Sequence, residues 1–256
     1  MKININADMG EGFGPWVMGD DAALLRVVGS ANIACGAHAG DPLVMARTLR
    51  AAQAAGVGIG AHPGYADLQG FGRRAMRLDA DDLRALVLTQ IGALRALAQA
   101  GGAVLRHVKP HGAMNNQACA DRAMADVIAQ AMADLDPTLI LLAPALSELA
   151  AAGRAAGLPV ALEAFADRTY QPDGQLASRG TSGAVLHDPQ QAAAHVIAML
   201  DRGGLVTTQG AVLATPIHSI CVHGDGPSAL ATATAVRDAL RGAGYALVDL
   251  PEVLRA

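Results

Sequence analysis

Residues 104–115 read VLRHVKPHGAMN, and this stretch predicts both a fold class and a site. Its apolar start is typical of a buried strand, whereas the KPHG that follows cannot continue one, because proline removes a ladder hydrogen bond. The polar groups are therefore expected at the carboxyl end of the strand, which is where α/β proteins place their chemistry. Lys109 is one of only two lysines among 19 basic residues, so we interpret it as functional. The alternative is a solvated lysine in a surface turn, beside the structural histidines His107 and His111.

The same order of strand, polar strand end and helix recurs along the chain. The expected strands lie at residues 2–7, 31–35, 57–61, 104–108, 138–142, 159–165 and 219–222. The polar residues that follow them are Asp8, Glu11, His38, His62, Lys109, His111, Asp167, Arg168, His223 and Asp225. The intervening helices are marked by their ends: Asp41, followed by proline, begins a helix that stops at Gly56, and Asp79 begins one that ends at Gly101.

This repeating pattern predicts a parallel sheet that is closed, or nearly closed, on itself, because such connections are right-handed by default. We expect an α/β fold, an irregular seven-stranded (β/α) barrel that spans residues 1–256 as a single domain. Residues 205–208 and 211–215 depart from a regular barrel and read as a hairpin, and residues 245–250 as a strand at an edge. A doubly wound open sheet is the alternative, but its G-x-G-x-x-G fingerprint is missing.

The composition favours a small partner in a reducing compartment. Charged residues make up 16% of the chain and the net charge is −4 without a basic run, which argues against a nucleic-acid or anionic-membrane partner. We see no signal peptide and no apolar stretch approaching about 18 residues, so we expect a cytoplasmic protein. The three cysteines have no C-x-x-C spacing, which argues against a disulfide framework.

The polar strand ends, if they share one barrel mouth, allow two kinds of chemistry. Asp8, His38 and His62 have ligand types suited to a divalent metal, whose bound water would become a nucleophile near neutral pH. Alternatively, histidines and carboxylates carry protons while Lys109 and Arg168 stabilise an anionic transition state or a phosphoryl group. Metal-site spacings such as H-E-x-x-H are absent, so the residues leave this choice open.

Two further segments predict substrate contacts. The loop at residues 63–77 carries Arg73 beside a glycine-flanked phenylalanine, and we expect either a lid that meets an anion or ordinary surface arginines. Asp167 and Arg168 stand side by side at a strand end. They would either orient a substrate carboxylate or form an internal ion pair that braces the following loop.

Six ordered blocks of the sequence resemble the LamB/YcsF family nearly end to end. The blocks are INADMGEGFG, NIACGAHAGDP, GAHPGY with GFGRR, VKPHGAMNN, EAFADRTY with DGQLASR, and ICVHGDGP. The resemblance implies a seven-stranded irregular barrel of the glycoside hydrolase/deacetylase type. It also implies a component of an ATP-dependent 5-oxoprolinase, which opens the lactam of 5-oxo-L-proline to L-glutamate together with two other subunits.

The resemblance also implies site residues, position by position. We expect catalytic residues at Asp8, Glu11, His38, Lys109, His111, Asp167 and His223, and substrate-binding residues at His62, Arg73, Arg168 and Asp225. Small departures from the family pattern are Ala7 and Met9 beside Asp8, Gly64 after His62-Pro63, and Met114-Asn115 after the lysine motif. They remove no ionisable group of the predicted mouth.

The implied reaction suits the predicted residues. A five-membered lactam is an almost unstrained amide with a poor leaving group, so ATP is a plausible cosubstrate, and we hypothesise that it phosphorylates the amide oxygen. No Walker A sequence is present, so ATP, with its Mg²⁺, binds through another motif or on a partner subunit. Two alternatives stay open: a stand-alone divalent-metal-dependent deacetylase or amidohydrolase, and a non-catalytic lactam-binding subunit.

Overall fold

Seven parallel strands close into a barrel in the computed structural model, which describes residues 1–178, 180–223 and 228–255. The strands are β1 (Lys2–Met9), β2 (Ser30–Ala34), β3 (Gly58–His62), β4 (Leu105–Val108), β5 (Ile140–Pro144), β6 (Val160–Phe165) and β9 (Ser219–Val222). They follow one another around the barrel in that order, and β9 pairs with β1 to close it. The predicted seven-stranded (β/α) barrel is therefore confirmed, and the open-sheet alternative is excluded.

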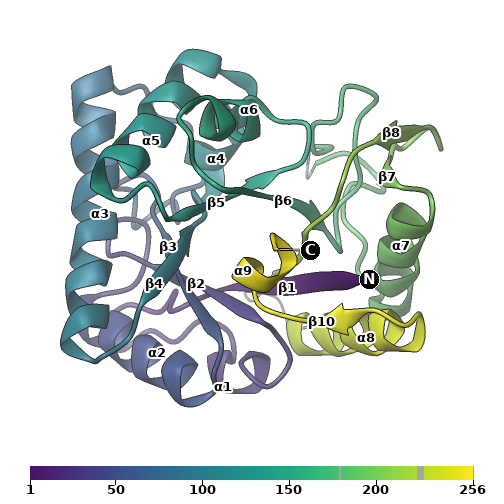
Figure 1. Cartoon of the computed structure of the whole chain (residues 1–256), viewed down its shortest axis with the longest axis horizontal. Coiled ribbons are helices and arrows are strands. Elements are labelled where there is room, and N and C mark those ends of the chain that lie inside the picture. The colour runs from purple at the N-terminus through teal and green to yellow at the C-terminus, as the bar shows by residue number, and fades with distance from the viewer. Residues whose placement is uncertain (179, 224–227, 256) are drawn as a thin grey trace.

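Helices surround the barrel, as Figure 1 shows. The described helices are α1 (Asp21–Leu24), α2 (Pro42–Ala54), α3 (Ala80–Ala100), α4 (Gly112–Ala120), α5 (Arg122–Leu135), α6 (Glu148–Ala155), α7 (Pro189–Asp201), α8 (Ala229–Gly242) and α9 (Leu250–Val253). Asp41 and Asp79 cap α2 and α3 as predicted, because their carboxylates accept hydrogen bonds from first-turn N–H groups. Every described helix is too short or too polar to cross a membrane.

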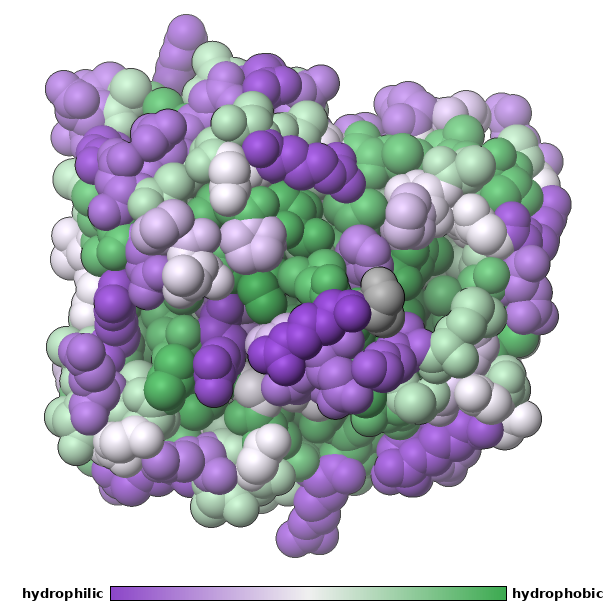
Figure 2. Space-filling model, viewed as in Figure 1, coloured by the Kyte–Doolittle hydropathy of each residue, from purple (hydrophilic) through white to green (hydrophobic). Residues whose placement is uncertain are grey.

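The carboxyl-terminal segment differs from its prediction. The expected strand at residues 245–250 is only β10 (Ala246–Leu247), which pairs with the start of β1. Asp249 then caps α9, so Leu250 begins a helix instead of continuing the strand. Leu250 and Leu254 pack against Ile140 and Leu142 inside the barrel and close its amino end. In Figure 1 this end faces the viewer, and Figure 2 shows hydrophilic side chains over α9 with apolar side chains around them.

Two other elements refine the predicted pattern. The hairpin is confirmed as β7 (Gly204–Val206) and β8 (Val212–Ala214), which pair antiparallel outside the barrel. The sequence pattern did not predict α4, which begins directly after His111 where the chain leaves β4. Gly112 starts this helix with a φ of +54°, and a Cβ there would press on the carbonyl oxygen of Gly72, so this turn requires glycine.

Beyond the apolar cluster under α9, the interior of the barrel is polar, whereas its outer face is apolar. Alternation along β1 turns Ile3 and Ile5 towards the helices and Asn4 and Asn6 towards the axis. Seven inward polar side chains from β1, β2, β4, β6 and β9 are buried and bonded to one another: Asn4, Asn6, Ser30, Asn32, His107, Glu163 and Ser219. Because buried polar groups are costly unless they are paired, this network fixes the register and contents of the barrel.

We predict that the interior network makes Gly60 irreplaceable. A Cβ at Gly60 would overlap the ring of His107 on the neighbouring strand, and β3 is hydrogen-bonded to β2 and β4 on its two sides. Gly60→Ala should lower the free energy of unfolding by about 1–3 kcal/mol, the usual cost of overpacking. Chemical denaturation of the purified wild-type and variant chains measures this change in the free energy of unfolding.

The control is Gly92→Ala in α3, where a Cβ meets nothing within 4 Å. Alanine should raise stability there by about 0.5–1 kcal/mol, because glycine is disfavoured in helix interiors. Equal effects at the two positions would contradict the packing described for the barrel interior.

Candidate active site at the carboxyl ends of the barrel strands

The predicted site residues gather at one end of the barrel. A cavity of about 180 Å³ opens there and is lined by Asp8, His62, Arg73, Lys109, His111, Arg168 and His223, among others. Glu11 and His38 adjoin it through His62 and His111. Asp167 is bonded to His223. Two larger hollows, of about 540 and 550 Å³, are lined by none of the predicted site residues. Asp225 lies outside the described residues.

Lys109 points back into the barrel instead of out towards solvent. Its Nζ lies 3.1 Å from Asn6 Oδ1, 3.2 Å from Asp8 Oδ1, 3.1 Å from Glu163 Oε2 and 3.0 Å from Cys221 Sγ. Burial opposes the charge of the ammonium, but Asp8, Cys221 and Glu163 together raise the pKa of Lys109 well above its usual value. We call these five residues the Lys109 cluster. Lys109 therefore acts as a buried cation that organises its neighbours.

Asp8 is oriented by this cluster. Its Oδ1 accepts hydrogen bonds from Lys109 and from Asn32 Nδ2, at 2.8 Å, whereas its Oδ2 lies 3.4 Å from Nε2 of His62. Burial alone would raise the pKa of Asp8, but His62 and Lys109 hold it well below the usual range. One carboxylate oxygen is thus fixed within the barrel, and the other faces the mouth as an ionised proton acceptor.

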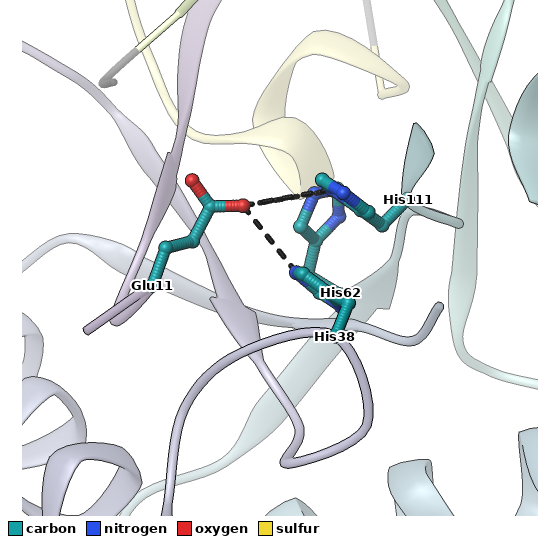
Figure 3. Close-up of side chains that lie close together, drawn as sticks. All are labelled: Glu11, His38, His62 and His111. Atoms are coloured by element: carbon teal, nitrogen blue, oxygen red, sulfur yellow. Dashed lines mark hydrogen bonds and ion pairs between the residues drawn. The ribbon is translucent and has the colours of Figure 1, made fainter. Parts of the chain in front are cut away.

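Above Asp8, one carboxylate and three imidazoles converge, as Figure 3 shows. Glu11, His38, His62 and His111 each offer a ligand atom, and these atoms all lie within 4.8 Å of one another. Glu11 Oε1 is 3.4 Å from Nε2 of His38 and 3.5 Å from Nδ1 of His111. The rings of His38 and His111 are stacked with centroids 3.7 Å apart. We call these four residues the Glu/His₃ cluster.

Backbone carbonyls fix which ring nitrogens face inward. His62 Nδ1 donates to the carbonyl of Lys109 at 2.7 Å, and His111 Nε2 donates to the carbonyl of Phe71 at 2.8 Å. The remaining nitrogens, Nε2 of His62 and Nδ1 of His111, therefore carry lone pairs, and they lie 2.9 Å apart. Burial lowers the pKa of His111 to about 3, so its ring is neutral. Two lone pairs this close to a carboxylate require a cation or a shared proton between them.

This arrangement fits a divalent transition metal. Carbonyl groups that hold the outer nitrogen of a ligating histidine are the usual support of metal sites. A tetrahedral ion with bonds of about 2.1 Å needs ligand atoms about 3.4 Å apart, and the distances to Glu11 of 3.4, 3.5 and 4.0 Å lie near that value. The predicted metal triad contained His38 and His62 but had Asp8 in place of Glu11 and His111. Asp8 lies beside the Glu/His₃ cluster, against His62.

Glycines let the histidines pack this closely. A Cβ at Gly64 would lie 2.8 Å from Nδ1 of His38, and one at Gly72 would lie 2.7 Å from Cβ of His38. Gly72 belongs to the predicted lid loop, whose Phe71 also contacts both stacked rings edge-on. In this structure the loop is a wall of the Glu/His₃ cluster. Exposed Arg73 lies over the Phe71 ring and lines the cavity.

On the opposite side of the cavity, Asp167 and Arg168 have separate partners. Both oxygens of Asp167 lie 2.8 Å from Nδ1 of His223, and this bond leaves the lone pair of the imidazole on Nε2. Burial opposes ionisation, but His223 holds the pKa of Asp167 below its usual value. Arg168 donates to the carbonyls of Ala177 and Ala184, so it braces the loop that follows β6 while also lining the cavity.

Sequence reasoning missed several buried residues that surround Lys109 and Asp8. It does not single out Glu163, Asn6 or Asn32, and it gives Cys221 no part in the site. A signal for Glu163 was present, because a charged residue in the middle of the apolar strand VALEAF must find a partner inside the protein. The asparagines of β1 and β2 alternate with apolar residues in the same way.

Comparison with known proteins shows the family of the chain. The model of the family described as the LamB/YcsF family matches residues 3–255. A relative from Azoarcus sp. (strain BH72), named as the A-type subunit of 5-oxoprolinase, is 56% identical over 253 residues and covers 99% of each chain. The crystal structure of a lactam utilization protein from Thermus thermophilus has a TM-score of 0.92 at 43% identity, over 97% of this chain and 99% of that one.

A more distant structure shows the fold type. The catalytic domain of a peptidoglycan N-acetylglucosamine deacetylase from Eubacterium rectale has a TM-score of 0.50 at 10% identity, over 96% of this chain and 87% of that one. The predicted barrel of the deacetylase type is confirmed.

From the geometry of the Glu/His₃ cluster, we predict that the chain binds a divalent transition metal. Metal-stripped protein should bind Co²⁺ in calorimetry and develop the visible absorption of a low-coordinate cobalt site. His38→Ala and His111→Ala should each weaken binding by about 100-fold or more, because each removes a ligand. His187→Ala, at an exposed histidine, is the control. Unchanged cobalt affinity in both ligand variants would exclude this site.

Proposed function

Because the chain belongs to the LamB/YcsF family, we propose that it is the lactam-hydrolysing subunit of a 5-oxoprolinase. In this function it converts 5-oxo-L-proline to L-glutamate with hydrolysis of ATP to ADP and phosphate, and it works with two other subunits of the B and C type. Relatives of about half identical sequence are named as the A-type subunit of 5-oxoprolinase, and the related solved structure is named a lactam utilization protein.

The observation that carries this proposal is the position of Asp8 at the floor of a small cavity. The space of about 180 Å³ suits a single five-membered ring. Asp8 presents one oxygen to that space while Lys109 and Asn32 hold the other. A carboxylate fixed in this way is suited to take a proton from water as the water attacks the lactam carbonyl.

The Asp167–His223 pair supplies the opposite function. Opening the ring breaks the bond between the carbonyl carbon and nitrogen, and the leaving nitrogen must gain a proton. His223, oriented by Asp167, lines the same cavity, and once its Nε2 has taken up a proton it would deliver that proton as an imidazolium. Arg73 and Arg168 line the cavity as cations for the substrate carboxylate. The reaction thus has a base and an acid on different sides of one space.

A metal would be held by Glu11, His38, His62 and His111, and when bound it supplies Lewis-acid polarisation of the substrate carbonyl. The chain's own residues still determine where the substrate lies. Gly64 and Gly72 shape the metal side of the mouth, and Phe165 stacks on His223 at the other side.

ATP is part of the proposal because the lactam is an almost unstrained amide with a poor leaving group. Transfer of the γ-phosphoryl group to the amide oxygen, with release of ADP, would activate the carbonyl carbon. Water would then add to that carbon and the C–N bond would break as the nitrogen gains a proton, which leaves an acyl phosphate. A second water attacks the carbonyl carbon of the acyl phosphate and releases phosphate and glutamate. The chain has no Walker A sequence, so we place the nucleotide and its Mg²⁺ on another motif or on a partner subunit.

With ¹⁸O in the lactam carbonyl, the label should appear in the released phosphate. Unlabelled phosphate would exclude the phosphorylation step.

The Glu/His₃ cluster also favours a second candidate, a stand-alone metal-dependent amidohydrolase. The two functions separate cleanly in one assay. Turnover by the chain alone, without ATP and abolished by a chelator, would support the second candidate and contradict the first. Glutamate and ADP formed only with all three subunits would support the first.

We predict that Asp8→Asn abolishes glutamate formation by the three-subunit complex. Asparagine keeps the size and the hydrogen bond from Asn32 but cannot accept a proton, so kcat should fall by about 10²- to 10⁴-fold, the usual contribution of a general base. A coupled assay for glutamate measures the change. A variant with at least a tenth of wild-type activity would exclude Asp8 as the base.

Substitution of each of the two lysines gives a test variant and its matched control. Lys109→Met removes the cation that orients Asp8, and we expect loss of both lactam binding and turnover. Lys2→Met removes the other lysine, which is exposed and bonded to Glu252 near the amino end of the barrel, and activity should be unchanged. Calorimetry with 5-oxoproline and the coupled assay report the two effects. If Lys109→Met still binds 5-oxoproline and still supports turnover, the proposed active site is wrong.

A further inference from the structure

A second cavity meets the proposed active site beside α4. It has a volume of about 280 Å³ and is lined by residues of α4, of the turn after β5 and of the loop after β6. Four residues line both this side cavity and the active-site cavity, and they form the boundary between the two: Asn115, Asn116, Arg168 and Leu176. The proposed reaction assigns a role to Arg168 but to none of the other three.

Asn115 has an amide group that is only partly used within the chain. The residue is 5% exposed. Its Oδ1 accepts a hydrogen bond at 3.9 Å from the thiol of Cys119, which lies further along α4, so the nitrogen of the amide faces away from Cys119. No described residue accepts a hydrogen bond from that nitrogen, Nδ2. Because a buried donor without an acceptor is costly, Nδ2 is suited to a ligand that enters the cavity.

The neighbours of Asn115 favour a negatively charged ligand group. Arg168, which is also buried, lines the same boundary as a cation. The first residues of α4, Gly112 and Ala113, line the active-site cavity, and the amino end of a helix carries partial positive charge. Asp8 is the one acid among the described residues that line the cavity, and it comes from β1, across the barrel from β4. A carboxylate beside Asn115 therefore meets donors and cations.

In the proposed reaction, this boundary is the place of the substrate carboxylate. Asp8 activates the water that attacks the carbonyl carbon, and His223 protonates the ring nitrogen. In 5-oxoproline that nitrogen is bonded to two carbons, the carbonyl carbon and the carbon that carries the carboxylate. With the carbonyl over Asp8 and the nitrogen beside His223, the carboxylate extends beyond His223. Arg168 lies on that side, because it follows Asp167, the partner of His223.

We propose that Asn115 is a further substrate-binding residue, whose Nδ2 group donates a hydrogen bond to the carboxylate of the lactam beside Arg168. The carbonyl oxygens of Ala177 and Ala184 hold the guanidinium of Arg168, so the charge at this boundary is in place before the substrate arrives. The pair selects a lactam with a carboxylate over the same ring with a neutral group at that carbon. This role rests on the proposed function, because the reaction determines the orientation of the ring.

Replacement of the amide by a carboxylate tests the contact. Asn115→Asp keeps the shape of the side chain, but at pH 8 it faces the substrate carboxylate with a like charge. Calorimetry on the full chain, alone and in the three-subunit complex, measures the dissociation constants of 5-oxoproline and of 5-oxoprolinamide, its neutral carboxamide. The affinity for 5-oxoproline should fall by about 100-fold or more. The affinity for the carboxamide should be kept, because its N–H groups can donate to the new carboxylate.

Asn115→Ala decides the matter if the introduced carboxylate keeps a proton or prevents folding. It removes the donor without adding charge. The affinity for 5-oxoproline should fall by about 10-fold or more and that for the carboxamide by less, because hydrogen bonds to charged acceptors are about twice as strong. In the complex, Asn115→Ala should raise KM for 5-oxoproline and leave kcat within about threefold, because the carboxylate is bound equally in the ground state and the transition state.

The matched control is Gln53→Glu, which also replaces an amide by a carboxylate, at an exposed position on α2. It should leave the ratio of the two dissociation constants unchanged.

The outcomes separate this inference from the proposed function. Equal affinity of the wild type for the two lactams, or a ratio that is unchanged in both folded Asn115 variants, would overturn the role of Asn115. A preference for 5-oxoproline that is lost in the variants would support that role even if the complex forms no glutamate, and such a complex would overturn the proposed function alone. Binding of neither lactam, by the chain or by the complex, would overturn both.

Discussion

A single ammonium group on the axis of a closed barrel is the constraint on which this structure depends. Lys109 reaches inward from the end of β4 and meets acceptors from β1, β6 and β9. A buried cation is stable only when its neighbours supply charge and hydrogen bonds in a fixed geometry. The positions of Asn6, Asp8 and Glu163 therefore follow from the position of Lys109, and the strands that carry them cannot shift register without breaking the cluster.

The polar interior and the apolar exterior have different functions in this barrel. Between the strands and the helices, small aliphatic side chains form the core, as the alanine-rich and leucine-rich sequence suggests. Inside, a chain of hydrogen bonds runs from His107 through Asn32 to Asp8. Such a network rigidifies its members because each amide can satisfy its neighbours in only one orientation. The active-site carboxylate is thereby held by the same bonds that hold the barrel together.

The mouth has two levels with different chemistry. The lower level presents Asp8 to a small cavity, and the upper level places Glu11 and three histidines where their ring nitrogens converge. The levels meet at His62, whose Nε2 faces both Asp8 and Glu11. A change in either level is thus transmitted to the other through one imidazole. This arrangement is compatible with the proposed hydrolysis of a small cyclic amide, and it links the Glu/His₃ cluster to the proton acceptor Asp8.

The strand ends and their polar residues were predictable from the sequence, because period-two alternation, helix caps and the KPHG break are local signals. Parallel strands bring their carboxyl ends together, so residues such as His38, His62 and His111 could be expected at one mouth from the sequence alone. Local patterns could not determine where a long side chain points. Only the tertiary structure turned Lys109 inward, paired Asp167 with His223 instead of Arg168, and placed Glu11 rather than Asp8 among the three histidines. Those choices depend on which buried charges meet across strands far apart in sequence, and that is decided by the closure of the barrel.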